Sequence, residues 1–177
     1  IHNFGNIYVS NFVKKKDINK GIKAPLKLVY CVNCKLLQLE HSAPQEIMYK
    51  KFYWYKSGIT KTMRDGLKEL YLDIKKNCKI KTGDVILDIG ANDGTLLKYF
   101  KKDKIITIGC EPAKNLKNEL KRNCHYMIND FWHTKHLKKI PLRHQKLKVV
   151  SAIGMFYDLE DPSQFIKHAA EALDDDG

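Results

Sequence analysis

The feature that most limits the possible folds is an alternation of apolar and amphipathic segments that begins at residue 85. The apolar runs VILDIG, IITIGCE, HYMIND and LKVVSAIGM are typical of strands, and the intervening TLLKYFKK, KNLKNELKRN and PSQFIKHAAEAL are typical of helices. Strands that are apolar throughout and alternate with helices indicate a parallel sheet covered by helices. The sequence therefore predicts an α/β fold.

Residues 1–50 show little helical periodicity. Residues 6–13 (NIYVSNFV) and 26–39 (LKLVYCVNCKLLQL) alternate or run apolar, as short strands do, and a polar loop separates them. We therefore expect a small β-rich module at the N-terminus.

A helix is predicted from Thr60 onward, because apolar residues recur there at helical spacing. These residues are Met63, Leu67, Leu70, Tyr71 and Ile74. We expect three parts: the β-rich module in residues 1–50, an aromatic segment with a connecting helix in 51–80, and the α/β core in 81–177.

Composition excludes several classes. The 177 residues are 44% hydrophobic, enough for a core, but no run approaches the roughly 20 apolar residues of a membrane span. No signal peptide is visible, and five cysteines, an odd number, argue against a disulfide framework. We expect a cytoplasmic protein without a membrane partner.

The net charge of +12 suggests nucleic acid at first, because basic proteins bind phosphates. Of the 32 basic residues, however, only Arg64, Arg122 and Arg143 are arginine, the residue that specific phosphate recognition favours. The lysines are scattered in twos and threes, so we interpret the charge as solvated surface and disfavour a nucleic-acid partner.

The motif VILDIGANDGTLL joins a strand to a helix through an acidic glycine loop. Gly90 and Gly94 permit a tight turn and close approach of a ligand. Asp88 and Asp93 make the loop a poor phosphate cradle, and they favour a ligand with positive charge, ammonium or hydroxyl donors. The motif matches neither the phosphate loop nor G-x-G-x-x-G.

Two further signals follow the next strands. Glu111 lies 23 residues after Asp88, where an acid in doubly wound folds holds ribose hydroxyls. Asp130 and Phe131 follow the third strand and could hold an adenine by hydrogen bonding and stacking. The structural alternative is that Asp88 caps a helix. The combination of the acidic glycine loop, Glu111 and the Asp130–Phe131 pair favours a nucleoside ligand.

These motifs resemble class I S-adenosylmethionine-dependent methyltransferases, in which LDIGANDGTLL corresponds to the first motif and GCEP to the second. Together with C-x2-C, LLQLEHSAP, YWYKSG and FYDLEDPSQFI, they resemble the sugar C-methyltransferase group, over most of residues 25–177. The resemblance implies a Rossmann-like parallel sheet, truncated at its C-terminus, behind a zinc-binding module. It implies S-adenosylmethionine as cofactor and a nucleotide-linked keto-deoxysugar as substrate.

The resemblance also implies residue roles. The methionine part of the cofactor would lie against the loop, the ribose at Glu111, and the adenine between Asp130 and Phe131. Tyr53 or Tyr55 would lie near the active-site entrance, and Tyr55 is a weak catalytic candidate; a purely structural alternative is an aromatic core cluster. The loop residues are Asp88, Gly90, Asn92, Asp93 and Gly94.

Cys31 and Cys34 have the spacing of half a structural zinc site, which needs four ligands. In the resembled group the other pair lies upstream, and neither His2 nor His41 has a persuasive spacing. Unligated cysteines are the structural alternative. We expect zinc in the intact protein.

The sequence reads as a piece of a longer protein. In the resembled group the general base follows the fifth strand, so we expect the 177 residues alone to lack methyl transfer. After the fourth strand, the resemblance places IGMFYDLED beside the substrate. The structural alternative is that Asp158 and Glu160 cap the helix that follows, and we favour it for Glu160. Alternative functions are methylation of RNA or another small molecule, and a zinc-ribbon-like binding module with a non-catalytic domain.

Overall fold

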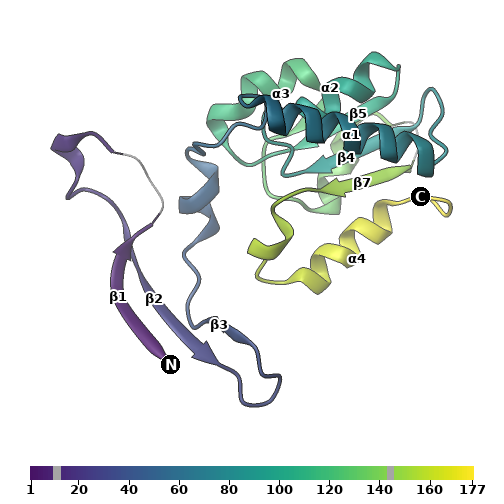
Figure 1. Cartoon of the computed structure of the whole chain (residues 1–177). Coiled ribbons are helices and arrows are strands. Elements are labelled where there is room, and N and C mark those ends of the chain that lie inside the picture. The colour runs from purple at the N-terminus through teal and green to yellow at the C-terminus, as the bar shows by residue number, and fades with distance from the viewer. Residues whose placement is uncertain (10–12, 143–145) are drawn as a thin grey trace. The chain divides into compact units, whose positions relative to one another are not determined.

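The computed structural model describes residues 1–9, 13–142 and 146–177 and divides the chain into two compact units, Ile1–Trp54 and Tyr55–Gly177 (Figure 1). The three-part organisation expected from the sequence, with boundaries after residues 50 and 80, stays a prediction. No helix in the described ranges is long and apolar enough to cross a membrane.

The first unit contains a three-stranded antiparallel sheet in the order β1-β2-β3. Its strands are β1 (His2–Tyr8), β2 (Lys23–Tyr30) and β3 (Leu37–Leu39), and a short π-helix, Glu46–Lys50, follows.

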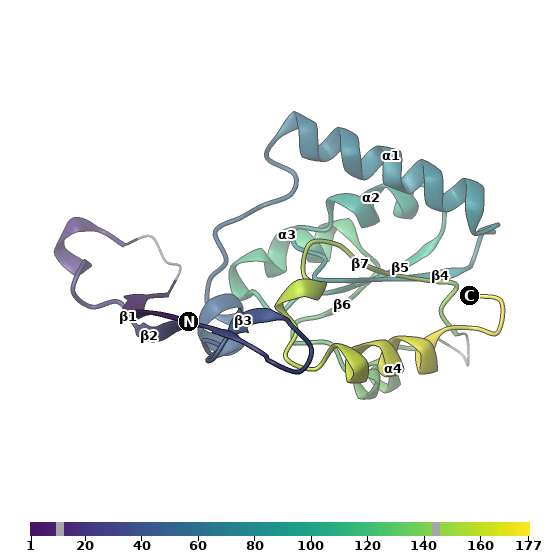
Figure 2. The same ribbon diagram turned by 60° about the horizontal axis from the view of Figure 1, so that its bottom comes forward.

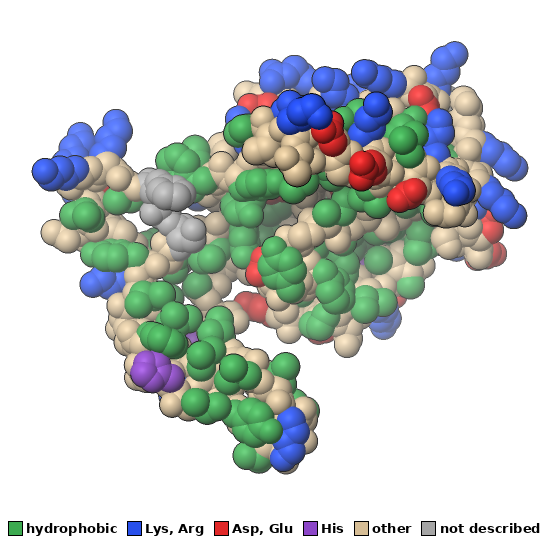
Figure 3. Space-filling model, in the orientation of Figure 1, with side chains coloured by type: hydrophobic (Ala, Val, Ile, Leu, Met, Phe, Trp, Pro, Cys, Tyr) green, Lys and Arg blue, Asp and Glu red, His purple; other side chains and the backbone are tan. Residues whose placement is uncertain are grey.

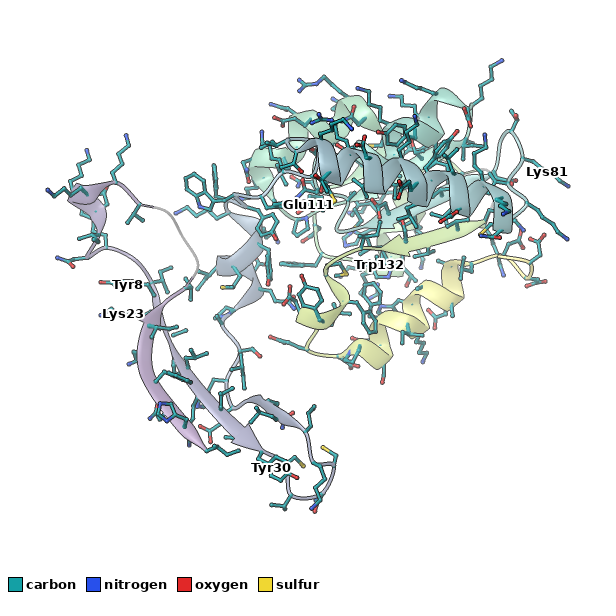
Figure 4. The ribbon with its side chains drawn as sticks, in the orientation of Figure 1. Tyr8, Lys23, Tyr30, Lys81, Glu111 and Trp132 are labelled. Atoms are coloured by element: carbon teal, nitrogen blue, oxygen red, sulfur yellow. The ribbon has the colours of Figure 1, made fainter. Side chains whose placement is uncertain are left out.

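The strand predicted over residues 6–13 is shifted, because β1 begins at His2 and residues 10–12 lie outside the described residues. The Lys23 Nζ atom lies 4.7 Å from the centre of the Tyr8 ring, and the two paired residues meet at one end of the ladder (Figure 4). The C-x2-C turn separates β2 from β3, so the apolar run over residues 26–39 forms two strands.

The second unit is built on a four-stranded parallel sheet in the order β6-β5-β4-β7. This confirms the α/β fold with a parallel sheet. The sheet's strands are β4 (Val85–Ile89), β5 (Ile106–Cys110), β6 (Tyr126–Ile128) and β7 (Val149–Ala152).

Helices cover both faces of this sheet (Figure 2). One apolar cluster includes Ile86 of β4 and joins that face of the sheet to α1, α2 and α3; the other includes Leu87 and joins the opposite face to α4. Successive strand residues point to opposite faces, which explains why β4 is apolar throughout. The helices are α1 (Lys61–Asn77), α2 (Thr95–Lys102), α3 (Lys117–Asn123) and α4 (Pro162–Ala172).

Helix caps correct one expectation. The Asp161 carboxylate, rather than Glu160 or Asp158, caps α4 by accepting a hydrogen bond from the Gln164 backbone N–H at 2.9 Å, and Pro162 occupies the first turn. The expectation that Glu160 is the cap is therefore wrong by one residue, because several acids precede the helix and the sequence alone does not distinguish them.

Lys and Arg side chains cover much of the outer surface of α1 and α2, with acidic side chains between them (Figure 3). Lys61 and Asp65, one turn apart on α1, form one such surface pair. Exposed pairs of this kind contribute little stability, which fits the interpretation of the lysines as a solvated surface.

Candidate functional site

The site lies at the carboxyl end of the parallel sheet, where β4 leads into α2 through residues 90–94. Backbone dihedral φ is positive at Gly90, Asn92 and Gly94, at 73°, 52° and 76°. The Gly90 and Ala91 N–H groups donate to the Cys110 carbonyl at 2.8 and 3.1 Å, which holds the loop against the end of β5.

Both the backbone dihedral angles and the nearby side chains require glycine at positions 90 and 94. A Cβ on Gly90 would lie 2.9 Å from Cγ of Met155, and one on Gly94 would lie 2.8 Å from Cβ of Asn123. Left-handed backbone already disfavours L side chains there. The turn predicted from the sequence is therefore present, and Met155 and Asn123 are site neighbours that sequence reasoning missed.

Asp88 is the penultimate residue of β4, and its carboxylate is buried. Its Oδ1 accepts a hydrogen bond from Oγ of Ser151 on β7 at 2.7 Å, and the strand register sets the two residues side by side. Burial, with a smaller contribution from the charge of Glu111, raises the pKa of Asp88 to about 7, although the Ser151 bond lowers it. A cation bound here would favour the charged carboxylate.

Asp88 is therefore not the cap of α2. The N-cap of α2 is Gly94, which makes no side-chain cap bond. Just before it, Asp93 Oδ1 accepts from the Thr95 N–H at 3.0 Å and from the Thr95 hydroxyl at 2.6 Å. Ser151 was missed as the partner of Asp88; its signal was a single hydroxyl within the apolar run LKVVSAIGM.

Glu111 follows β5, and its buried carboxylate faces the loop. Oε2 accepts from the Asn92 N–H at 3.0 Å, and Oε1 accepts from the Ala113 N–H at 2.9 Å. Burial raises the pKa of Glu111, whereas these two backbone bonds lower it. A carboxylate has about four acceptor positions, so two remain for the hydroxyl groups of a ligand.

Asp130 and Phe131 follow β6, and both are half-buried. Asp130 Oδ1 accepts from the Phe131 N–H at 2.9 Å, and the Asp130 carbonyl lies 3.3 Å from the Cys110 thiol. Asn129, which the sequence did not single out, donates to the Glu111 carbonyl at 2.8 Å and ties this turn to β5. The indole Nε1 of the next residue, Trp132, is buried without a hydrogen-bond partner in the described part of the chain.

In Figure 4, Glu111 lies at the carboxyl end of the parallel sheet. This is the end toward which the β7 arrow points in Figure 1. The predicted residues Asp88, the loop and Glu111 thus come together through hydrogen bonds and register. The assignment of any of them to a cofactor stays a prediction.

Two predicted residues have other partners. Asn92 and Asp93, expected to line the cofactor, direct their side chains to residues 55–58, as described below. The Tyr55 side chain is 43% exposed, and its carbonyl accepts a hydrogen bond from the Asn92 amide at 3.0 Å.

In the first unit, Cys31 and Cys34 lie in the turn between β2 and β3. Hydrogen bonds from the backbone and thiol of Cys34 and from the backbone of Asn33 lower the pKa of the Cys31 thiol. Among the described residues, no group of three or more His, Cys, Asp or Glu side chains is arranged to hold a metal ion.

A family model described as "Methyltransferase domain" matches residues 55–177. The chain belongs to this methyltransferase domain family. The matched range coincides with the second unit, so the sheet, the acidic glycine loop and Glu111 all belong to the methyltransferase domain.

The relatives are distant. A C-methyltransferase, NovU, from Streptomyces niveus is 25% identical over 92 residues, which cover 52% of this chain and 22% of that protein. The chain thus spans less than a quarter of this curated relative.

Solved structures of two methyltransferases described as SAM-dependent, both in complex with S-adenosyl-L-homocysteine, are also similar. The one from Thiobacillus denitrificans is 18% identical, with a TM-score of 0.47, over 64% of this chain and 45% of that one. The one from Geobacter sulfurreducens is 18% identical, with a TM-score of 0.48, over 71% and 49%.

Proposed function

We propose that the methyltransferase domain binds S-adenosylmethionine at the carboxyl end of its sheet and uses it to methylate a ring carbon of a nucleotide-linked keto-deoxysugar. The observation that carries the cofactor assignment is the pair of buried carboxylates, Asp88 and Glu111, on either side of the glycine loop. Buried carboxylates require compensation, and a cationic ligand with hydroxyl groups supplies it.

The residues present fit this cofactor. Glu111 keeps two acceptor positions for the ribose hydroxyls, and Asp88 has a raised pKa because its buried carboxylate has no cationic partner among the described residues. Phe131 and Asp130 would flank the adenine. When bound, the cofactor supplies an electrophilic methyl group, and the domain's residues hold it in line with the acceptor carbon.

The acceptor assignment is supported by the sequence likeness to a C-methyltransferase and by the motifs of the sugar C-methyltransferase group. Carbon methylation beside a ketone also needs a base that removes the neighbouring proton and groups that stabilise the enolate. We assign neither to this chain, because the resembled group carries them after the fifth strand.

The cofactor test is titration calorimetry with S-adenosylmethionine. We expect binding by the wild type and a loss of at least about tenfold in affinity in Glu111→Gln, since the amide offers one acceptor oxygen where the carboxylate offers two. Glu69→Gln, an exposed glutamate on α1, is the matched control. Equal affinity in Glu111→Gln and the wild type would contradict the assignment of Glu111.

The acceptor test uses the full-length protein with a nucleotide-linked keto-deoxysugar, and RNA as the competing acceptor. We expect a new carbon–methyl bond in the sugar by NMR, and exchange of the proton beside the ketone in heavy water. Methylated RNA and an unchanged sugar would overturn this assignment.

We propose further that Cys31 and Cys34 form half of a structural zinc site in the full-length protein. A thiol whose pKa is lowered by backbone N–H groups favours the thiolate that zinc requires. We expect one zinc per chain, lost in Cys31→Ser and retained in Cys78→Ser. Zinc at the wild-type level in Cys31→Ser would contradict this proposal.

A further inference from the structure

Residues 55–58, which we call the strap, have no regular secondary structure but are held firmly in place. The Tyr55 carbonyl accepts from the Asn92 amide at 3.0 Å, and the Ser57 N–H donates to Oδ1 of Asn92 at 3.0 Å. The Gly58 N–H donates to Oδ2 of Asp93 at 2.7 Å. Side chains of the glycine loop therefore bind three polar groups of the strap backbone.

The strap is also held from its other side. The Arg64 guanidinium on α1 donates to the carbonyls of Gly58 and Ile59, each at 2.8 Å. Lys56 and Glu119 form an ion pair at 2.8 Å. The strap is thus fixed between α1, the loop and α3.

Asn92 and Asp93 are committed to this arrangement. Asn92 Oδ1 also accepts the Asp93 N–H at 2.9 Å, and Asp93 Oδ1 binds Thr95, so every polar side-chain atom of the two residues has a partner within the domain. Both side chains are buried. A ligand of the loop would therefore meet neighbouring groups, because binding Asn92 or Asp93 directly would break these bonds.

Asn92 also connects the strap to Glu111. Its backbone N–H donates to Glu111 Oε2, while its side chain holds Tyr55 and Ser57. One residue in a left-handed conformation thus contacts both the carboxylate proposed to hold the ribose and the strap.

We propose that Asn92 and Asp93 are positioning residues, which hold the strap as a wall of the cofactor site and couple it to Glu111. The inference rests on the proposed binding of S-adenosylmethionine. Because coupling is reciprocal, cofactor binding slows backbone exchange in the strap, and loosening the strap weakens cofactor binding.

Gly58→Ala tests the contact between the strap and the loop without substituting a loop residue. The backbone at Gly58 is not left-handed, but a Cβ there would lie 2.7 Å from both Asp93 Oδ2 and Thr95 Oγ1. Gly66→Ala on α1 is the matched control, since a Cβ at Gly66 meets nothing within 4 Å.

We expect Gly58→Ala to bind S-adenosylmethionine about tenfold more weakly by calorimetry, and to exchange amide hydrogens faster in the strap while α2 stays protected. Gly66→Ala should remain within about twofold of the wild type. Asn92→Asp, which keeps the acceptor but loses the donor to Tyr55, should show a smaller loss and serves if Gly58→Ala does not fold.

Two outcomes separate the inference from the proposed function. Faster strap exchange with wild-type affinity in either variant would overturn the inference alone. A wild-type protein that does not bind S-adenosylmethionine would overturn the proposed function, and the inference with it.

Discussion

Asp88→Asn should stabilise the unliganded protein at neutral pH and weaken its cofactor binding. In the folded state the pKa of Asp88 is about 7, against 3.8 for an ordinary aspartate. The folded protein therefore holds more protons than the unfolded chain between these values. The free energy of unfolding falls as the pH rises through this window. Asp88 leaves it undiminished only below pH 3.8, where the carboxyl group is neutral in both the folded and the unfolded state.

The magnitude follows from the size of the shift. About 3 pKa units at 1.36 kcal/mol each correspond to about 4 kcal/mol of stability lost by pH 7. Asparagine occupies nearly the same volume and keeps an oxygen for the Ser151 hydroxyl, but its buried amide N–H groups cost about 1–2 kcal/mol if unpaired. We therefore expect Asp88→Asn to raise the free energy of unfolding by about 2–3 kcal/mol at pH 8 and not to raise it near pH 4.

The assay is urea unfolding followed by circular dichroism between pH 4 and pH 8, with Asp73→Asn, an exposed carboxylate on α1, as the control. Calorimetry in parallel should show that wild-type affinity for S-adenosylmethionine rises as the pH increases through 7, because Asp88 becomes charged, and that this dependence is lost in Asp88→Asn. Parallel stability curves for Asp88→Asn and the wild type over the whole pH range would refute the reasoning.

Three further predictions concern residues around the site and the helix cap. Gly90→Ala should lower stability by about 1–2 kcal/mol through its left-handed backbone, and more through the Met155 collision, so adding Met155→Ala should recover part of the loss in thermal unfolding. Ser151→Ala removes the bond that lowers the Asp88 pKa, so the pKa measured by NMR should rise above the wild-type value; a fall would contradict the assigned partner. Asp161→Ala should cost about 1 kcal/mol, whereas Glu160→Ala should lie within about 0.5 kcal/mol of the wild type, and the reverse order would restore Glu160 as the cap.

Local patterns in the sequence were enough to predict the strands and helices of the α/β core and their order. The predicted helix TLLKYFKK is α2, Thr95–Lys102, and the strand in VILDIG is β4, Val85–Ile89. Such segments are fixed by apolar periodicity, by capping residues and by glycines that permit left-handed backbone, all of which act between near neighbours in the chain. The β-rich character of residues 1–50 was predicted on the same grounds, although the bounds of β1 were not.

Which side chains meet in the site became visible only in the folded structure. Asn92 and Asp93 belong to a motif that indicated a ligand, yet their bonds to the strap cross 35 residues of sequence, and the bond from Ser151 to Asp88 crosses 63. Local propensity cannot specify such pairs, because they depend on strand order and on how helices pack over the sheet. The burial that raises the pKa of Asp88 arises in the same way, since it comes from the surrounding elements rather than from the loop itself.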